Sequence, residues 1–520
     1  MKTATDTPNS SYKWLVLGNV MIGTFMAVLD STVVNTGLPA IMGTLGASIN
    51  TAEWVLTGYM LAIASVLPAA AWLSDRYGYK RIYFLSVLVF TVGSFMCGNS
   101  ASIEELIFWR VIEGFGCGAI MPVGMAIVSN SFPPEQRGLA LGFWAIASAA
   151  SVSFGPSIGG YLVDNLNWNY IFYVNVPVGI FALFFTAVII KEYKAEKVQP
   201  FDIPGFITSG IFLPVFMYGL SEVNSATNTQ GWNSPTVLGS MWISVIMFVL
   251  FIYFELTVKH PLINLRLFKD SNFALSNLMM MIFGIGMFGS TFLIPLYLQN
   301  NLGYSALQAG MFFIPVGILQ GISSPIAGAL GQRINSKILI ATGLLLMAFS
   351  FYLNFYLSFL TEKWYVMLSL YLRGVGMGIL FTPLLTLSLA NIKPQSMAQA
   401  SSITNIIRQM GGSIGVAIFS YTLTQRTNYH TQRYSEALNN TGETYRQTVE
   451  NLSQFAQQTA GAAQHTAQSL AEQMVLKRLE LEAYIGGIND DFYIAFIVTL
   501  LCILPIFWLK RIKKQPKKTP

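Results

Sequence analysis

The sequence predicts an all-α integral membrane protein with fourteen transmembrane helices, in which two six-helix repeats flank two inserted helices. Three observations lead to this fold: few charged residues, fourteen long apolar segments and a one-sided distribution of lysine and arginine. Of the 520 residues, 53% are hydrophobic and 10% are charged, whereas roughly a quarter of the residues in a soluble protein are charged. The basic residues behind the net charge of +6 form only short, scattered clusters, so we expect no nucleic-acid partner.

The fourteen apolar segments each provide the roughly 20 residues that a helix needs to cross a bilayer. Several of them contain glycine and proline, and small residues allow neighbouring helices in a membrane to approach closely. We therefore expect one crossing from each segment. The segments are centred near Gly23, Leu61, Val87, Gly118, Ala149, Phe181, Leu213, Met247, Gly286, Gly317, Leu345, Gly378, Ala417 and Thr499.

The basic residues in the connections predict the orientation. With alternating crossings, 21 lysine and arginine residues lie on one side, and the short connections on the other side hold one, Lys363. Because basic connections stay in the cytoplasm, we expect both termini to be cytoplasmic. The expected parts are a cytoplasmic N-terminus (1–13), an N-terminal six-helix bundle (14–191), two inserted helices (203–257), a C-terminal six-helix bundle (271–510) and a basic cytoplasmic tail (511–520).

The C-terminal bundle includes a long connection, 427–487, that we expect on the external side. It is rich in glutamine, threonine and alanine, and apolar residues such as Leu452, Phe455 and Leu470 recur at helical spacing. This pattern predicts an external helical hairpin that caps the bundle.

An internal repeat relates the two bundles. The stretch 114–134 aligns with 374–394 at an offset of 260 residues, and three glycines and a proline match. A duplicated bundle with a site between its halves is the architecture of an alternating-access transporter.

Two acidic residues and three arginines lie deep inside the predicted spans, where ionisable groups are costly and are functional candidates. Arg110 and Glu113 are three residues apart and share one helix face. At 1.5 Å per residue, Arg110 and Asp30 lie about 10 and 12 Å below the same membrane surface. The three side chains are thus expected to meet, or else to face a watery cavity independently. Arg373 and Arg408 are the other two buried arginines.

Five motifs follow one another along the chain: "LDSTVVNTGLP", "LSDRYGYKR", "RVIEGFGCGA", "SFGPSIGG" and "NWNYIFYVNVPVG". Together they resemble the major facilitator superfamily, and within it the fourteen-helix drug/proton antiporters of the EmrB and QacA type. The chain departs from the family pattern at four positions: Ala71 and Ser151 stand in place of glycine, Glu113 in place of glutamine, and Asn169 in place of arginine.

The second motif combines Asp75, Arg76, Gly78, Lys80 and Arg81 in a turn between two helices. Gly78 suits a tight bend, and the basic residues also fit a simple cytoplasmic connection. The resemblance implies a conformational gate.

The fourth motif contains Gly155, Pro156, Gly159 and Gly160 within one span. Proline in a helix removes a hydrogen bond and bends it, and the glycines allow close packing. The resemblance implies a bend that seals the closed state of an exporter.

These features predict a proton-coupled efflux transporter for lipophilic drugs or other amphiphiles. Burial disfavours an ionised carboxylate and a nearby arginine favours it, so a conformational change can load or release a proton. We expect Asp30 to be the principal proton site, with Glu113 second and Arg110 as their partner. Met26, Asn35 and Arg408 are candidates for a substrate cavity. The alternatives are that Met26 faces lipid and that Arg408 pairs with backbone carbonyls or water at a helix kink.

The main alternative is a transporter of the same fold that is dedicated to one natural metabolite and works as an antiporter or as a symporter. A membrane enzyme is not indicated, because the sequence shows no metal-ligand spacing and no nucleophile motif. We expect no cofactor besides the proton gradient. The resemblance implies the inner membrane of a bacterium, and the hairpin is a possible dock for a periplasmic adaptor that leads to an outer-membrane channel.

Overall fold

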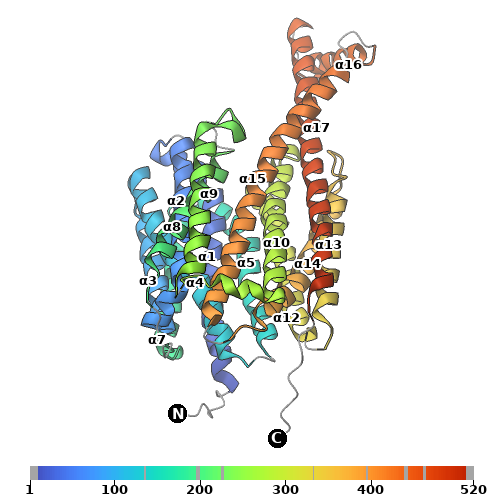
Figure 1. Ribbon diagram of the computed structural model, residues 1–520. Coiled ribbons are helices and arrows are strands. Elements are labelled where there is room, and N and C mark those ends of the chain that lie inside the picture. The colour runs from blue at the N-terminus through green and yellow to red at the C-terminus, as the bar shows by residue number, and fades with distance from the viewer. Residues whose placement is uncertain are drawn as a thin grey trace, which may run out of the picture.

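The computed structural model describes residues 10–47, 49–133, 136–194, 200–223, 228–259, 261–331, 333–393, 396–437, 443–460 and 464–510. Within these residues the chain forms helices and connecting loops without a strand (Figure 1). Each of the predicted segment centres lies inside a helix. Residues 1–9 of the predicted N-terminal segment (1–13) and the whole predicted tail (511–520) lie outside the described residues.

The N-terminal half contains α1 (Ser10–Leu45), α2 (Ile49–Tyr77), α3 (Tyr79–Gly98), α4 (Ile103–Ser131), α5 (Arg137–Asn165), α6 (Tyr170–Tyr173) and α7 (Asn175–Ile189). Local sequence explains where α4 begins: the Ser102 side chain accepts a hydrogen bond from the Glu105 backbone N–H, and two acidic residues occupy the first turn. The short α6 and α7 together form the sixth predicted segment.

The inserted helices are α8 (Ile203–Glu222) and α9 (Pro235–Thr257), which pack against each other, with α8 also against α2. Two buried carboxylates tie their ends to the chain that follows. Asp202 accepts from the backbone N–H groups of Gly205 and Leu262, at 2.9 and 3.2 Å. Glu255 accepts from the backbone N–H of Ile263 with both oxygens, each at 3.1 Å. These bonds fix the inserted pair as a unit.

The C-terminal half contains α10 (Ser271–Leu296), α11 (Ala306–Met311), α12 (Ile314–Leu330), α13 (Ser336–Asn354), α14 (Lys363–Leu389), α15 (Met397–Ala437), α16 (Glu443–Ala460) and α17 (Gln464–Leu501). Eleven helical stretches of the described chain are long and apolar enough to cross a membrane, and Ser271–Met287 is a shorter apolar helix. The fold is therefore a multi-span helical bundle, as the sequence predicts at this coarser level.

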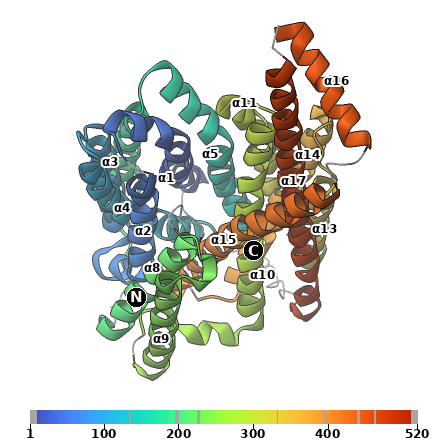
Figure 2. The same cartoon turned by 90° about the horizontal axis from the view of Figure 1, so that it is seen from above.

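Close glycine contacts join the two halves along α5 and α12. A Cβ built on Gly328 meets the Gly138 carbonyl oxygen at 2.3 Å, and one built on Gly142 meets Pro325 Cα at 2.8 Å. Any larger side chain at these positions would separate the helices. On the other side of the interface, α15 packs against α2 and α4 (Figure 2).

The first residues of α1 and the last described residues after α17 lie at the same end of the bundle, which we call the termini end (Figure 1). At the opposite end, the hairpin end, α15 and α17 continue beyond the other helices and α16 packs on α17. The helices predicted for the connection 427–487 are thus present, but they project from the bundle and do not cap it. At their base, Asp490 bonds to Arg426 and His430 at 2.6 and 2.7 Å, which ties α15 to α17.

Candidate functional site

Three charged side chains from α1 and α4 meet inside the N-terminal half. The Nη1 atom of Arg110 donates to Asp30 Oδ2 at 2.7 Å and to Glu113 Oε2 at 2.8 Å. All three side chains are fully buried. We call this group the triad. The depth and helix-face arguments from the sequence therefore predict the geometry, although they say nothing about the bonding pattern.

Further residues, which the sequence argument missed, hold the triad in place. Asn175 at the start of α7 donates to Asp30 Oδ1 and to Ser94 Oγ, both at 3.1 Å. The Cys97 thiol lies 3.5 Å from Glu113 Oε2. Asn175 was visible in the fifth motif as a lone amide within an apolar run, which is the one sequence signal for it.

The guanidinium of Arg110 is also fixed from two other directions. Its Nε donates to the Val55 carbonyl oxygen at 3.2 Å, and its Cζ lies 3.7 Å from the centroid of the Tyr59 ring. A cation over an aromatic face is favourable, more so without water. Arg110 is therefore held by α2 as well as by its two carboxylate partners.

The triad carries unequal charge. One guanidinium faces two carboxylates, so one negative charge is left over when both are ionised. Asp30 has both oxygens bonded, one to Arg110 and one to Asn175. Glu113 has one oxygen, Oε1, buried without a hydrogen-bond partner among the described residues. Because an uncompensated buried charge is costly, a single proton on the triad would be stabilised there.

The turn between α2 and α3 binds to the last turn of α7 and to the chain that follows it. Gly78 has a φ of 104°, which other residues rarely adopt. The Tyr79 hydroxyl donates to Asp75 Oδ1 at 2.9 Å. Lys80 donates through its backbone N–H to Glu192 and through Nζ to the Ala187 carbonyl oxygen.

The outermost basic residues of this turn are more loosely held. Arg81 Nε lies 3.6 Å from Glu192 Oε2, with most of the Arg81 side chain exposed, and Arg76 is also exposed. Glu192 is the partner that the sequence argument missed, because it lies outside the motif. The motif's bonds in this structure thus close the α2–α3 turn onto the segment after α7.

The α5 motif packs on two different helices. A Cβ added to Gly155 would clash with Thr32 Oγ1, and a Cβ added to Gly159 would clash with Thr36 Oγ1. Both threonines lie on α1. Both threonine hydroxyls bond to backbone carbonyls on α1, Thr36 to Val33 at 2.7 Å. The first and second glycines of the motif therefore allow α5 to lie directly on the helix that carries Asp30.

The opposite side of the motif faces α11 in the other half. A Cβ on Gly310 would lie 2.9 Å from Ser157 Oγ and 3.2 Å from Pro156 Cβ. Gly160 faces Leu307 at 3.6 Å. Within the membrane bundle, the α5 motif thus lies between α1, which bears a member of the triad, and the C-terminal half.

The structure does not gather the three predicted cavity residues in one place. Met26 is fully buried, whereas Asn35 is exposed, and nine residues at about 100° each put them on opposite faces of α1. Arg408 is buried at the contact between the halves, where its Nη2 lies 3.9 Å from Met121 Sδ on α4 and 3.4 Å from Asn405 Oδ1.

Arg373 on α14 is a buried charge of a different kind. The 260-residue offset of the internal repeat places it opposite Glu113. Its Nε and Nη1 atoms have no hydrogen-bond partner among the described residues. From 271 to 426 the sequence contains a single acidic residue, Glu362. The C-terminal half therefore has positive charge where the N-terminal half has a carboxylate pair.

The described residues contain no group of three or more histidine, cysteine, aspartate or glutamate side chains arranged to hold a metal ion. The three cysteines are free and buried.

A family model described as Major Facilitator Superfamily matches residues 20–416. The chain belongs to the major facilitator superfamily. Among solved structures, this superfamily member resembles the proton:xylose symporter XylE bound to a sugar analogue (TM-score 0.59, 13% identity, 97% of each chain) and the human organic anion transporter MFSD10 (TM-score 0.56, 14% identity, 94% of this chain and 99% of that one). Those identities support the shared fold alone.

Closer relatives include multidrug export proteins and a fatty acid resistance protein. This major facilitator protein is 30% identical to the multidrug export protein EmrB of Haemophilus influenzae over 94% of each chain. It is 32% identical to EmrB of Escherichia coli strain K12 over 86% of this chain and 88% of the relative. It is also 30% identical to the fatty acid resistance protein FarB of Neisseria gonorrhoeae over 96% of each chain. The predicted resemblance is confirmed: the protein is a multi-pass membrane transporter.

Proposed function

We propose that this protein is a proton-coupled antiporter that exports lipophilic drugs or other amphiphiles by alternating access. The observation that carries the proposal is the bridging of two buried carboxylates by a single atom of Arg110. That arrangement leaves one exchangeable negative charge inside the membrane. The names of the relatives, multidrug export proteins and a fatty acid resistance protein, support outward movement of amphiphiles.

The proton carrier in the conformation described is Glu113. Asp30 receives a hydrogen bond on each oxygen, from Arg110 and from Asn175. The Oε1 atom of Glu113 has no hydrogen-bond partner among the described residues. Its Oε2 atom accepts hydrogen bonds from Arg110 and from the Cys97 thiol. Hydrogen bonds to the charged form favour that form, so the proton settles on the carboxyl group that has an oxygen without one. This ranks Glu113 ahead of Asp30, the reverse of the order expected from sequence.

Movement of α1 then couples the proton to transport. The triad depends on α1 for Asp30, on α4 for Arg110 and Glu113, and on α7 for Asn175. A shift of α1 along the α5 glycines would lengthen the Asp30–Arg110 contact. Glu113 would then be the one carboxylate of the triad still paired with Arg110. Glu113 would then lose its proton, because a cation close to a carboxylate favours ionisation. Substrate bound between the halves, where Arg408 lies, biases the same movement.

The proposal includes the arrangement in the membrane. The protein makes fourteen crossings as two six-helix bundles, 14–191 and 271–510, with the inserted pair 203–257 between them. The termini end faces the cytoplasm of a bacterium, and the α2–α3 turn acts there as the conformational gate. The hairpin end faces the periplasm, where α16 and its neighbours dock an adaptor protein that leads to an outer-membrane channel.

Transport into inverted membrane vesicles tests the function. An imposed proton gradient, acidic inside, should drive the uptake of several unrelated lipophilic compounds from a panel of cations, anions and neutral molecules. Collapse of the gradient with an ionophore should abolish that uptake. Uptake of one compound only would favour a dedicated metabolite transporter, and uptake driven by the opposite gradient would favour symport. Uptake that is indifferent to the gradient would contradict proton coupling.

A further inference from the structure

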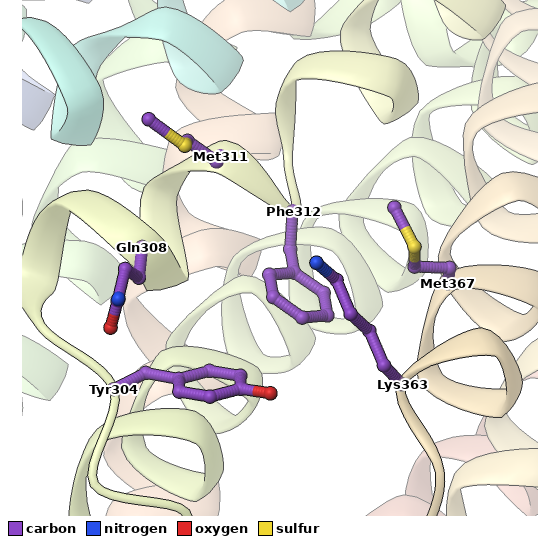
Figure 3. Close-up of a pocket in the computed structure, with 6 residues that line it drawn as sticks. All are labelled: Tyr304, Gln308, Met311, Phe312, Lys363 and Met367. Carbon is purple, nitrogen blue, oxygen red and sulfur yellow. The ribbon is translucent and has the colours of Figure 1, made fainter.

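A separate pocket lies in the C-terminal half at the hairpin end, between α11 and α14 (Figure 3). Its volume is about 180 Å³. Asn301, just before α11, bonds to the Leu481 carbonyl oxygen on α17, and Arg478 stacks on Phe359 just before α14, which places the pocket near the base of the hairpin. Aromatic, thioether and amide groups line it with one cation: Tyr304, Gln308, Met311, Phe312, Lys363 and Met367.

Lys363 is the unusual member of this lining. It is the one basic residue in the short connections on its side of the membrane. Its Nζ lies 5.4 Å from the centroid of the Phe312 ring. The adjacent carboxylate, Glu362, accepts from Trp364 Nε1, and Lys363 has no ion-pair partner among the described residues. The pocket therefore presents a free ammonium group beside an apolar wall.

A second cation lies deeper on the same helix. Arg373 follows Lys363 by ten residues, or about 15 Å along α14. Its Cζ lies 5.6 Å from the ring centroid of Phe313, the residue after Phe312. Both cations of α14 thus contact the turn between α11 and α12. Arg373 is 1% exposed, and positive charge in a poorly solvated region acts over a longer range than in water.

We propose that this pocket binds a single-chain amphiphile with an anionic head group, a carboxylate or a phosphate. The head group pairs with Lys363 at the mouth. The hydrocarbon chain packs on Phe312 and on the thioethers of Met311 and Met367, which adapt to irregular apolar shapes. Arg373 increases the preference for an anion without contacting it, and the same two charges exclude a cationic amphiphile of equal length.

The position of the pocket gives its occupant a means to influence the transporter. Gln308 and Met311 line the pocket from one side of α11. The other side of α11 carries Leu307 and Gly310, which face the α5 motif across the contact between the halves. A ligand in the pocket therefore supports α11 against α5. The site is separate from the triad, and its existence does not depend on the proposed antiport.

Binding of sodium dodecanoate tests the site. The full chain is purified into nanodiscs of phosphatidylcholine at pH 8, and affinity is measured by calorimetry beside dodecanol and dodecyltrimethylammonium. Wild type should bind dodecanoate at least about tenfold more tightly than either control, a difference of about 1.4 kcal/mol. K363Q should lose about tenfold in affinity, and K363R should retain it. K393Q, in the loop that follows the other end of α14, should bind as wild type does.

A second variant and a measurement in nanodiscs that contain an anionic lipid complete the test. M367W fills the pocket and should abolish binding while leaving the melting temperature within a few degrees of wild type. Nanodiscs that contain lysophosphatidylglycerol, a single-chain anionic lipid, distinguish the source of the ligand. Competition with dodecanoate identifies lipid phosphate as an occupant, and its absence identifies a free amphiphile. Equal dodecanoate binding by wild type, K363Q and M367W would overturn the proposal, as would equal binding of the cationic control.

Discussion

Single residues set the charge balance of the triad. Arg110 donates through one nitrogen to both Asp30 and Glu113, and its Nη2 has no partner among the described residues. The second carboxylate is therefore not matched by a second cation. The surrounding groups, Asn175 and Tyr59, orient the members of the triad but add no formal charge.

The carboxamide variants of the two acids should differ in their effects. E113Q removes the proposed proton carrier and should reduce gradient-driven efflux by at least about 100-fold, within the range that loss of a general acid or base produces. Substrate exchange without a gradient should persist in E113Q, because alternating access itself is retained. D30N should reduce both processes, since Asp30 anchors α1 to Arg110. Assays of both processes in the same proteoliposomes separate these outcomes, and full gradient-driven efflux by E113Q would contradict the assignment.

Removal of Arg110 should destabilise the protein through its buried partners. R110M leaves two carboxylates uncompensated, and breaking a buried ion pair costs about 3–5 kcal/mol. Thermal unfolding in detergent should show a large loss for R110M. The triple variant D30N/R110M/E113Q, which contains no charge in the triad, should recover most of that loss. A triple variant no more stable than R110M would show that shape, and not charge, determines the loss.

At the scale of helices, the contact between α1 and α5 depends on glycine. A Cβ on Gly159 would lie 2.1 Å from Thr36 Oγ1, with its next neighbours at 3.1 and 3.2 Å. G159A should therefore lower both the melting temperature and the transport rate, and T36A in the same chain should restore them by removing the hydroxyl. G160A is a matched control because its nearest neighbour is 3.6 Å away. Equal effects of G159A and G160A would contradict this packing.

The α2–α3 turn should be equally sensitive to substitution at Gly78. Gly78 has a positive φ, and a Cβ there would meet the Glu192 carboxylate. G78A should cost roughly 1–3 kcal/mol from the backbone alone, because φ 104° and ψ 143° lie in a region that essentially only glycine adopts, and should release Glu192 from Lys80. G43A, in open space on α1, provides the control. Cysteine accessibility of S74C, measured beside thermal unfolding, would report whether the turn opens, and unchanged accessibility in G78A would argue against a gate at this position.

At the scale of the whole molecule, the projecting hairpin is separable from the bundle. Replacement of 438–463 with a short glycine-serine linker should leave uptake into inverted vesicles within about twofold of wild type, because the triad and α5 are untouched. Drug resistance of intact bacteria that have an outer membrane should fall to the vector level, since the proposed adaptor dock is lost. Full resistance in cells would contradict the docking role.

The sequence predicted the helical membrane fold and the meeting of Asp30, Arg110 and Glu113, because apolar length and depth along a helix follow directly from residue order. It did not predict Asn175 or Glu192 as partners, since those contacts depend on how distant helices pack. The hairpin was expected to cap the bundle, but α15 and α17 continue straight beyond it. Local pattern reveals a helix and its apolar face, not the direction in which a long helix projects.

The central claim is that the triad carries the exchanged proton. The most direct measurement is proton movement in proteoliposomes that contain a trapped pH dye, with a transported compound from the vesicle panel added outside. In wild type, protons should move opposite to the substrate in a fixed ratio. The ratio should be on the order of one proton per substrate molecule, because the triad has one carboxylate more than it has cations. E113Q should move substrate without protons. Proton counterflow in E113Q at the wild-type ratio would contradict the account.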